Sequence, residues 1–207
     1  MKKNLLIATT NPAKLAEYQL LLHAFDLQLI SLRDAGIATE APEHATTFAE
    51  NARMKACFYF ARAGIATLAD DGGLEVDALG GAPGVRSHRW LGIDDPDDRA
   101  LAAAIIQRMA GVAAPRRTAR LRAAAALIYR TGETTREVIV EAALDGVIPD
   151  RCYPEVRKGF PYRSVLYLPD RGCYLAELSE GDAAQISQRR SLIEKLAVEL
   201  ARLSRRQ

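Results

Sequence analysis

Two adjacent carboxylates, Asp70 and Asp71, are the residues of this sequence whose types and spacing best suit chemistry. They follow the apolar run 65–69, which is typical of a strand, and precede two glycines, so the pattern predicts an acidic pair at the strand's carboxyl end. With Glu40 and Glu43 of an upstream polar segment they could bind Mg²⁺, which takes a few carboxylates and completes its shell with water and phosphate oxygens. Asp-Gly-Gly is also a strong turn signal, so a purely structural turn is the alternative.

A second candidate site lies near the start of the chain, where Thr9 and Thr10 follow a short apolar run. Asn11 suits a helix N-cap and Pro12 suits the first helical position. Free backbone N–H groups and the positive end of the helix dipole attract phosphate at such a junction, and Lys14 adds a full charge one turn further on. The spacing is not that of a P-loop, so a capped helix with an exposed lysine is the alternative.

A third group comprises Glu50, Asn51 and Lys55, which fall on neighbouring turns of a helix predicted over residues 48–63. A buried Glu or Asn at this place could bond to the phosphate-binding loop, and Lys55 could reach a phosphate. A solvated helix face would give the same pattern, so the group is weak when taken alone.

These segments sit in an alternation of strand-like and helix-like runs. The strand–loop–helix–strand opening favours an α/β protein. The segment at 40–47 is predicted to be a polar loop, the one at 80–84 a turn-rich loop, and 146–169 irregular. Hydrophobic periodicity predicts strands at 5–8, 27–30, 65–69, 119–129, 137–144 and near 165–168, and helices at 12–25, 48–63, 96–110 and 183–203.

The overall composition is that of a chain with a substantial core. The 207 residues suit one large domain or two lobes that share a cleft, with 49% hydrophobic and 26% charged residues. The net charge of +2 is too small to imply a nucleic-acid partner. We interpret the basic end, with Arg202, Arg205 and Arg206, as a solvated helix terminus rather than a nucleic-acid-binding tail.

The sequence gives no sign of a membrane or export segment. No apolar run approaches the roughly 20 residues that span a bilayer, and the run at 5–8 is too short for a signal peptide. The three cysteines, Cys57, Cys152 and Cys173, lack metal-ligand spacing. We therefore expect a cytoplasmic protein with reduced thiols and no membrane partner.

Taken together, the segments 8–14, 47–56 and 69–84 resemble a known family, the Ham1-like inosine/xanthosine triphosphate pyrophosphatases. The resemblance covers nearly the whole chain, and its last segment is long and specific. It implies an elongated, two-lobed α/β fold over residues 1–207, with a central mixed sheet flanked by helices and a cleft between the lobes. It also implies a homodimer and Mg²⁺-dependent cleavage of a nucleoside triphosphate to the monophosphate and pyrophosphate.

The resemblance also implies roles for individual residues. Asp71 would bind Mg²⁺ and accept the proton, Glu43 would be a further metal ligand, and Lys55 would neutralise the phosphates during catalysis. Water attack on phosphorus needs a base, a metal and cations that absorb developing charge, and this inventory contains all three. The other residues implied to hold the triphosphate are Thr9, Thr10, Asn11, Lys14 and Gly72.

The half of the family pattern that reads the base is altered. Pro161 and Arg163 stand where the family has Gly and Asp, Ala183 stands in place of Lys, and Gln188 in place of His. An unpaired buried donor costs about 1–3 kcal/mol, so losing donors should weaken the rejection of a base that carries an amine. Arg163 adds a charged donor fork, or alternatively points to solvent. The other base contacts implied are Phe160, Tyr162 and Arg189; Gly72 for Ser and Arg86 for Tyr are lesser departures.

Three functions follow as hypotheses. The first is a nucleoside triphosphate pyrophosphohydrolase, nominally acting on dITP, ITP and XTP, with altered base preference. The second is a dedicated hydrolase of a modified or biosynthetic nucleotide. The third is a non-catalytic nucleotide-binding protein, against which the retention of Asn11, Lys14, Lys55 and Asp71 argues.

Overall fold

The computed structural model describes residues 2–87, 89–93 and 96–204, and the chain divides into two compact units. Unit 1 comprises Met1–Asp71, Ala123–Ala142 and Arg189–Gln207, and unit 2 comprises Gly72–Arg122 and Ala143–Gln188. The described strands follow the sheet order β2-β1-β3-β4-β5-β6-β7. Three long strands contribute residues to both units: β3 (Ala66–Val76), β4 (Thr118–Thr131) and β5 (Thr134–Val147). The predicted α/β class is confirmed.

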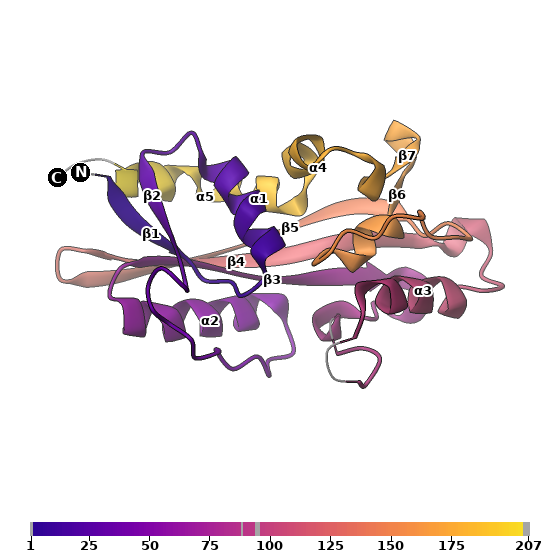
Figure 1. The fold of residues 1–207 in the computed structure, drawn as a ribbon, viewed down its shortest axis with the longest axis horizontal. Helices are drawn as coiled ribbons and strands as arrows, with labels where there is room; N and C mark the ends of the chain where they lie inside the picture. The colour runs from indigo at the N-terminus through magenta and orange to yellow at the C-terminus, as the bar shows by residue number, and fades with distance from the viewer. Residues whose placement is uncertain (1, 88, 94–95, 205–207) are drawn as a thin grey trace. The chain divides into compact units, whose positions relative to one another are not determined.

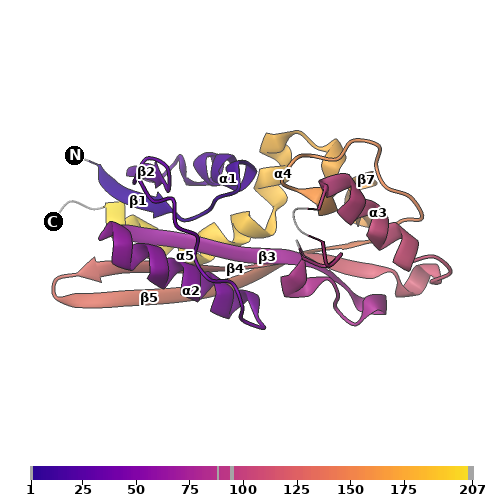
Figure 2. The same ribbon diagram turned by 60° about the horizontal axis from the view of Figure 1, so that its bottom comes forward.

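Unit 1 is built on parallel strands. The strand β1 (Lys3–Ile7) pairs in parallel with β2 (Leu27–Ser31) on one side and with β3 on the other. In Figures 1 and 2, helices α1 (Pro12–Leu22) and α5 (Gln188–Ser204) cover one face of this part of the sheet, and α2 (Phe48–Ala63) covers the other. Each face of β3 in unit 1 is therefore turned toward a different set of helices.

The core of unit 1 follows the predicted apolar faces. The fully buried side chains of Leu5 and Leu6 come from β1, where both faces of the strand are covered. The apolar stripe predicted for the closing helix is confirmed, since its leucines are buried. Its members are Leu192, Leu196, Leu200 and Leu203.

Both α1 and α2 begin at a capping side chain, and α2 also ends at a left-handed glycine. Thr47 caps α2 by accepting a hydrogen bond from the Glu50 N–H, and Gly64 ends it with a left-handed φ of 66°. The predicted bounds of α2 are therefore confirmed. Helix α1 begins at Pro12 as predicted but ends at Leu22, three residues before the predicted end.

The prediction that β3 ends before Asp70 is wrong. The strand continues through both aspartates and both glycines to Val76, so Asp-Gly-Gly is not a turn here. Gly73 is required for packing, because a Cβ at this position would lie 1.9 Å from Ser87 Oγ and 2.6 Å from the Gly84 carbonyl oxygen. The two carboxylates thus lie in the middle of the strand rather than at its end, with strand residues before and after them.

Unit 2 has a core of its own. It contains α3 (Asp98–Arg108), α4 (Glu180–Ile186) and the short strands β6 (Tyr167–Leu168) and β7 (Cys173–Tyr174). Strand β6 pairs antiparallel with β5 through Val147 and Tyr167, so the sheet is mixed. Its buried cluster includes Leu74, Val76, Leu101, Ile105, Met109, Ile148, Val165 and Leu166.

The predicted single closing helix over 183–203 is wrong. The chain forms α4 and then α5, and Ser187 between them is extended, with ψ of 156°. The Ser187 hydroxyl donates to the Ala184 carbonyl oxygen, which satisfies the backbone at the break. No Pro or Gly marks this position in the sequence. The exposed Arg202 pairs with Glu199, as expected of a solvated helix end; Arg205 and Arg206 lie outside the described residues.

No helix in the described part of the chain is both long and apolar enough to cross a membrane. The three cysteines are free thiols of intermediate exposure.

Candidate active site

Asp71 lies near the middle of β3 with its carboxylate turned toward α2. Its Oδ2 accepts a hydrogen bond of 2.9 Å from Asn51 Nδ2, and its Oδ1 is 3.6 Å from Lys55 Nζ. Asn51 and Lys55 are four residues apart on α2, which places them one above the other on the same helix face. The structure therefore brings together the predicted base and the predicted catalytic lysine.

Lys55 is bound by oxygens on several sides. Its Nζ is 2.8 Å from Glu43 Oε1 and 3.3 Å from the Asp70 carbonyl oxygen, in addition to its approach to Asp71. Burial by itself lowers the pKa of Lys55, but the negative charges of Asp71 and Glu43 outweigh it and raise this pKa above its usual value. Lys55 therefore carries a positive charge at neutral pH.

Asp70 is directed to the other face of β3, as the alternation of a strand requires. Its Oδ2 is 3.1 Å from Lys14 Nζ and 3.0 Å from Nη2 of Arg189. Burial opposes ionisation of Asp70, yet these two cations hold its pKa well below the usual range. For Lys14, burial outweighs the attraction of Asp70 and lowers the pKa. Adjacent carboxylates thus serve two separate sets of cations.

Arg189, which the family resemblance implies as a base contact, pairs with two carboxylates of unit 1. Its guanidinium is buried in unit 1, where it contacts Asp70 and lies 3.2 Å from Glu17 Oε2. Tyr18 lies beside this network, and its buried hydroxyl and Asp70 Oδ1 have no hydrogen-bond partner among the described residues. Sequence reasoning missed Glu17 and Tyr18. A charge three residues after Lys14 was the signal available, because i and i+3 share a helix face.

The loop before α1 is organised by its own side chains. Asn11 Oδ1 accepts from the N–H groups of Ala13 at 2.9 Å and Lys14 at 3.3 Å, and Thr9 Oγ1 accepts from the Asn11 N–H at 3.2 Å. Thr10 is exposed. The predicted N-cap is confirmed, and the alternative of an exposed lysine is wrong, because the largely buried Lys14 side chain pairs with Asp70.

The group on α2 divides into two roles. Asn51 is fully buried, and while its Nδ2 holds Asp71, its Oδ1 accepts from the Ala45 N–H at 3.0 Å. It therefore links the 40–47 loop to the carboxylate rather than to the loop before α1. The Glu50 carboxylate accepts from the Thr47 hydroxyl at 3.0 Å, so Glu50 supports the N-cap of α2.

The donor set around Asp71 fits Mg²⁺ in number and kind. Two carboxylates, Asp71 and the half-exposed Glu43, share one cation, the ammonium of Lys55. Among the described residues no three His, Cys, Asp or Glu side chains cluster as a self-sufficient metal site. Magnesium does not need such a cluster, because it commonly binds one or two carboxylates and takes its remaining oxygens from water and substrate phosphates.

The residues implied to read the base lie in unit 2, apart from Arg189. Arg163 is only 5% exposed, and its guanidinium carbon is 3.8 Å from the centroid of the Phe160 ring, so the alternative that it points to solvent is wrong. Tyr162 is buried, and its hydroxyl donates to the Ser87 carbonyl oxygen at 2.6 Å. Ala183 is fully buried in the unit 2 core. Pro161 and Gln188 are also buried.

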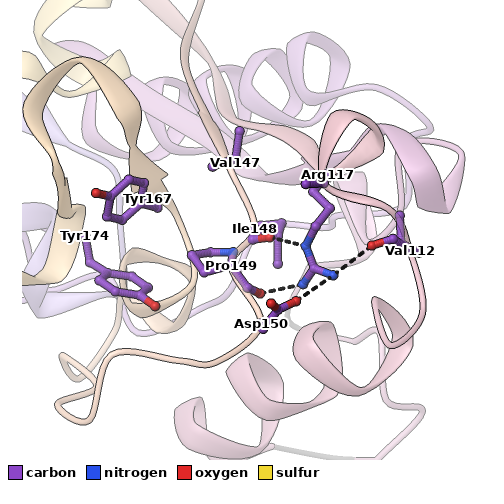
Figure 3. A pocket seen from close by; sticks show the side chains of 9 residues that line it. Val112, Arg117, Val147, Ile148, Pro149, Asp150, Tyr167 and Tyr174 are labelled. Atoms are coloured by element: carbon purple, nitrogen blue, oxygen red, sulfur yellow. Dashed lines mark hydrogen bonds and ion pairs between the residues drawn. The ribbon is translucent and has the colours of Figure 1, made fainter.

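Unit 2 also contains a cavity of about 420 Å³ that none of these residues lines (Figure 3). Its one buried charge is Arg117, which donates to the carbonyl oxygens of Ile148, Met109 and Val112 and pairs with Asp150. The guanidinium is thus occupied in holding the chain after β5. The cavity walls also include Val147, Pro149, Tyr167 and Tyr174.

Comparison with known proteins agrees with this architecture. The model of the Ham1 family matches residues 5–199, so the chain belongs to the Ham1 family. It is 40% identical to the dITP/XTP pyrophosphatase of Geobacillus kaustophilus, covering 94% of this chain and 92% of that protein. It is 37% identical to the dITP/XTP pyrophosphatase of Exiguobacterium sibiricum, covering 95% and 96%. The solved structure of a HAM1 protein from Coxiella burnetii superimposes with a TM-score of 0.82 at 28% identity, covering 98% and 100%.

Proposed function

We propose that this protein is a Mg²⁺-dependent nucleoside triphosphate pyrophosphohydrolase with an altered preference for the base. As a member of the Ham1 family with pyrophosphatase relatives, it is a hydrolase that acts on triphosphate anhydride bonds. The observation that carries the proposal is the buried Asp71 carboxylate, fixed by Asn51 and flanked by the Lys55 ammonium.

In the proposed reaction, water adds to phosphorus and the bond between the α- and β-phosphates breaks, which yields the monophosphate and pyrophosphate. The Asp71 carboxylate, held in place by the hydrogen bond from Asn51, accepts the proton of the water. Lys55 and Lys14 neutralise the phosphate oxygens, and the loop 9–11 with Gly72 receives the triphosphate. Bound by Asp71 and Glu43, Mg²⁺ would withdraw charge from the phosphate oxygens.

The change in base preference is supported by Arg163. A buried guanidinium stacked on Phe160 presents donors only, so it favours bases or substituents that offer acceptors. This observation also supports the second hypothesis, a dedicated hydrolase of a modified nucleotide that carries a keto or anionic group. The family resemblance further suggests a cytoplasmic homodimer, which should give twice the chain mass of 22.6 kDa in light scattering.

Pyrophosphate release from a panel of nucleoside triphosphates, with and without Mg²⁺, tests the proposal. We expect turnover of at least one triphosphate only with the metal, and strong turnover of an unusual triphosphate beside poor turnover of ITP would favour the dedicated hydrolase. The absence of turnover on the whole panel would contradict the enzymatic function.

Asp71→Asn is the matching variant, because Asn keeps the size of the side chain and an oxygen for Asn51. It should lower kcat by about 10²–10⁴-fold or more on every substrate, since it removes the proton acceptor. Binding without turnover in the wild type, unaffected by this change, would indicate a nucleotide-binding protein instead.

A further inference from the structure

The ammonium of Lys55 lies 2.8 Å from Glu43 Oε1 and 3.6 Å from Asp71 Oδ1, and these two carboxylates are the ones that would hold a divalent cation. We propose that Lys55 is a built-in counter-ion of the two carboxylates that exchanges with the divalent cation. When the cation binds, the Lys55 ammonium is released from the carboxylates and pairs with the triphosphate. The proposal rests on the proposed function, because it concerns the same metal and substrate.

The first argument is the number of donors on Lys55. A lysine ammonium has three N–H groups, and here it has three oxygen neighbours: Glu43 Oε1 at 2.8 Å, the Asp70 carbonyl oxygen at 3.3 Å and Asp71 Oδ1 at 3.6 Å. The contacts to Glu43 and the Asp70 carbonyl oxygen are within hydrogen-bond distance, and the approach to Asp71 is an ion pair. A substrate phosphate therefore competes with the two carboxylates for the Lys55 ammonium.

The second argument is the occupancy of the carboxylates themselves. Asp71 Oδ2 is held by Asn51, so Oδ1 is the oxygen left for a cation, and Lys55 is the cation beside it. Two monovalent cations do share one oxygen at Asp70, where Lys14 and Arg189 both contact Oδ2, but a divalent cation on Asp71 Oδ1 would repel the Lys55 ammonium with twice the charge. A divalent cation bound by Glu43 and Asp71 therefore favours movement of Lys55 away from Asp71 on its flexible four-carbon stem.

The third argument is what displacement does to Lys55. Its side chain is only 10% exposed, so an ammonium that has lost its carboxylates there carries a desolvation penalty. A phosphate oxygen removes this penalty by supplying a new negative partner. Cation binding is consequently unfavourable without nucleotide and favourable with it, which is a coupling between the two ligands.

The test measures Mg²⁺ affinity by calorimetry without any nucleotide. Lys55→Met removes the competing ammonium but keeps the length of the side chain, and we expect Mg²⁺ to bind about 10-fold tighter or more, within the usual range of coupling between ligands. Unchanged or weaker Mg²⁺ binding in Lys55→Met would overturn the proposal.

Two matched controls separate exchange from a general loss of positive charge. Lys14→Met removes a buried ammonium that pairs with Asp70, and Arg53→Met removes a cation on α2 that pairs with the exposed Glu137. Each should change Mg²⁺ affinity by much less than Lys55→Met does. An equal gain in Lys14→Met would mean that the local field, rather than displacement of Lys55, governs the cation.

A second arm measures the coupling directly, with a triphosphate analogue whose α–β bridge is a non-hydrolysable methylene group. In the wild type, Mg²⁺ should tighten analogue binding, and in Lys55→Met most of that enhancement should disappear. Undiminished enhancement in the variant would contradict the proposed transfer of charge. Thermal melting with and without Mg²⁺ verifies that the variant folds and should show a larger Mg²⁺-induced rise in Tm than the wild type.

The outcomes distinguish this inference from the proposed function. Turnover in the wild type with no gain in Mg²⁺ affinity in Lys55→Met rejects the exchange and keeps the enzyme. A gain in affinity in a protein that hydrolyses no triphosphate rejects the enzyme and keeps the competition between Lys55 and the cation.

Discussion

At the scale of single residues, Asp70 and Asp71 show how neighbours in sequence can differ in task. Asp70 is surrounded by Lys14, Arg189 and the buried side of α1, so its charge balances other charges. Asp71 has one oxygen, Oδ1, turned toward the ammonium of Lys55. We therefore expect changes at Asp70 to act mainly on stability and changes at Asp71 to act mainly on turnover.

Asp70→Asn should destabilise the fold by about 3–5 kcal/mol, because it removes the buried carboxylate that pairs with Lys14 and leaves Arg189 to pair with Glu17 alone. It should also alter the response to acid. The folded pKa of Asp70 lies below its unfolded value near 3.9, so its stabilisation is present above about pH 4 and is lost as the pH falls toward the folded pKa. Urea unfolding of the wild type between pH 6 and pH 3 should lose stability more steeply than that of the variant.

The control for this prediction is Asp77→Asn, which removes an exposed carboxylate paired with Arg120. An exposed pair of this kind contributes about 0–1 kcal/mol, so the free energy of unfolding should change little. Equal losses in the two variants would show that burial does not set the contribution of Asp70.

At the scale of elements, the N-cap of α1 both begins the helix and sets the direction of Lys14. Asn11→Ala removes the acceptor for the Ala13 and Lys14 N–H groups, and should cost about 1 kcal/mol in stability. Because the Lys14 N–H then loses its hydrogen-bond acceptor, the Lys14 side chain is positioned less firmly, and we also expect KM for the triphosphate to rise. Initial rates of pyrophosphate release measure this KM.

Ser179→Ala is the matched control, since Ser179 caps α4 by accepting from the Asp182 N–H. It should lower stability by a similar amount and leave KM unchanged. A parallel rise of KM in both variants would mean that lost stability, not the position of Lys14, is responsible.

Strand β3 passes close to residues 84–87 at Gly73, a position with no catalytic role, and this close approach predicts a loss of stability on substitution. Gly73→Ala would place a methyl group against Ser87 Oγ and the Gly84 carbonyl oxygen, and should destabilise by about 1–3 kcal/mol or more. Chemical denaturation measures this loss. Gly181→Ala on α4, where the nearest atom is 3.9 Å from the added Cβ, should be neutral or stabilising.

The helices and strands also show which parts of the fold could be predicted from the sequence. The bounds of α2 were predictable because Thr47 and Gly64 carry local capping signals. The continuation of β3 through Asp70 and Asp71 was not, because those charges are accepted in a strand only through cations on α1, α2 and α5. The break at Ser187 has no local signal either. The residue types of the site were predictable from motifs, whereas the pairing of Lys14 with Asp70 required three dimensions.

At the scale of the whole molecule, three strands supply residues to both units, so neither unit owns a complete sheet. We expect a single cooperative unfolding transition. Ile105→Ala in the unit 2 core should cost about 2–5 kcal/mol and lower Tm by about 5 °C or more. Fluorescence of Trp90, the single tryptophan, and far-UV circular dichroism should report the same midpoint.

Two separate transitions in that experiment, with only the fluorescence midpoint displaced, would show that the units unfold independently. The wild type, melted under the same conditions, supplies the reference for both probes.

The opposite orientation of the two aspartates on β3 has a consequence for how this lineage can diverge. On one face of β3, Asp70 pairs with Lys14 and Arg189. On the other face, Asp71 pairs with Lys55 and accepts a hydrogen bond from Asn51. Because a change in one member alters the requirement on its partners, replacements should accumulate jointly within each trio and independently between the two. A one-residue insertion in β3 ahead of Asp70 would turn Asp70 toward α2 and Asp71 toward α1 and α5, so that each carboxylate would face the cations of the other.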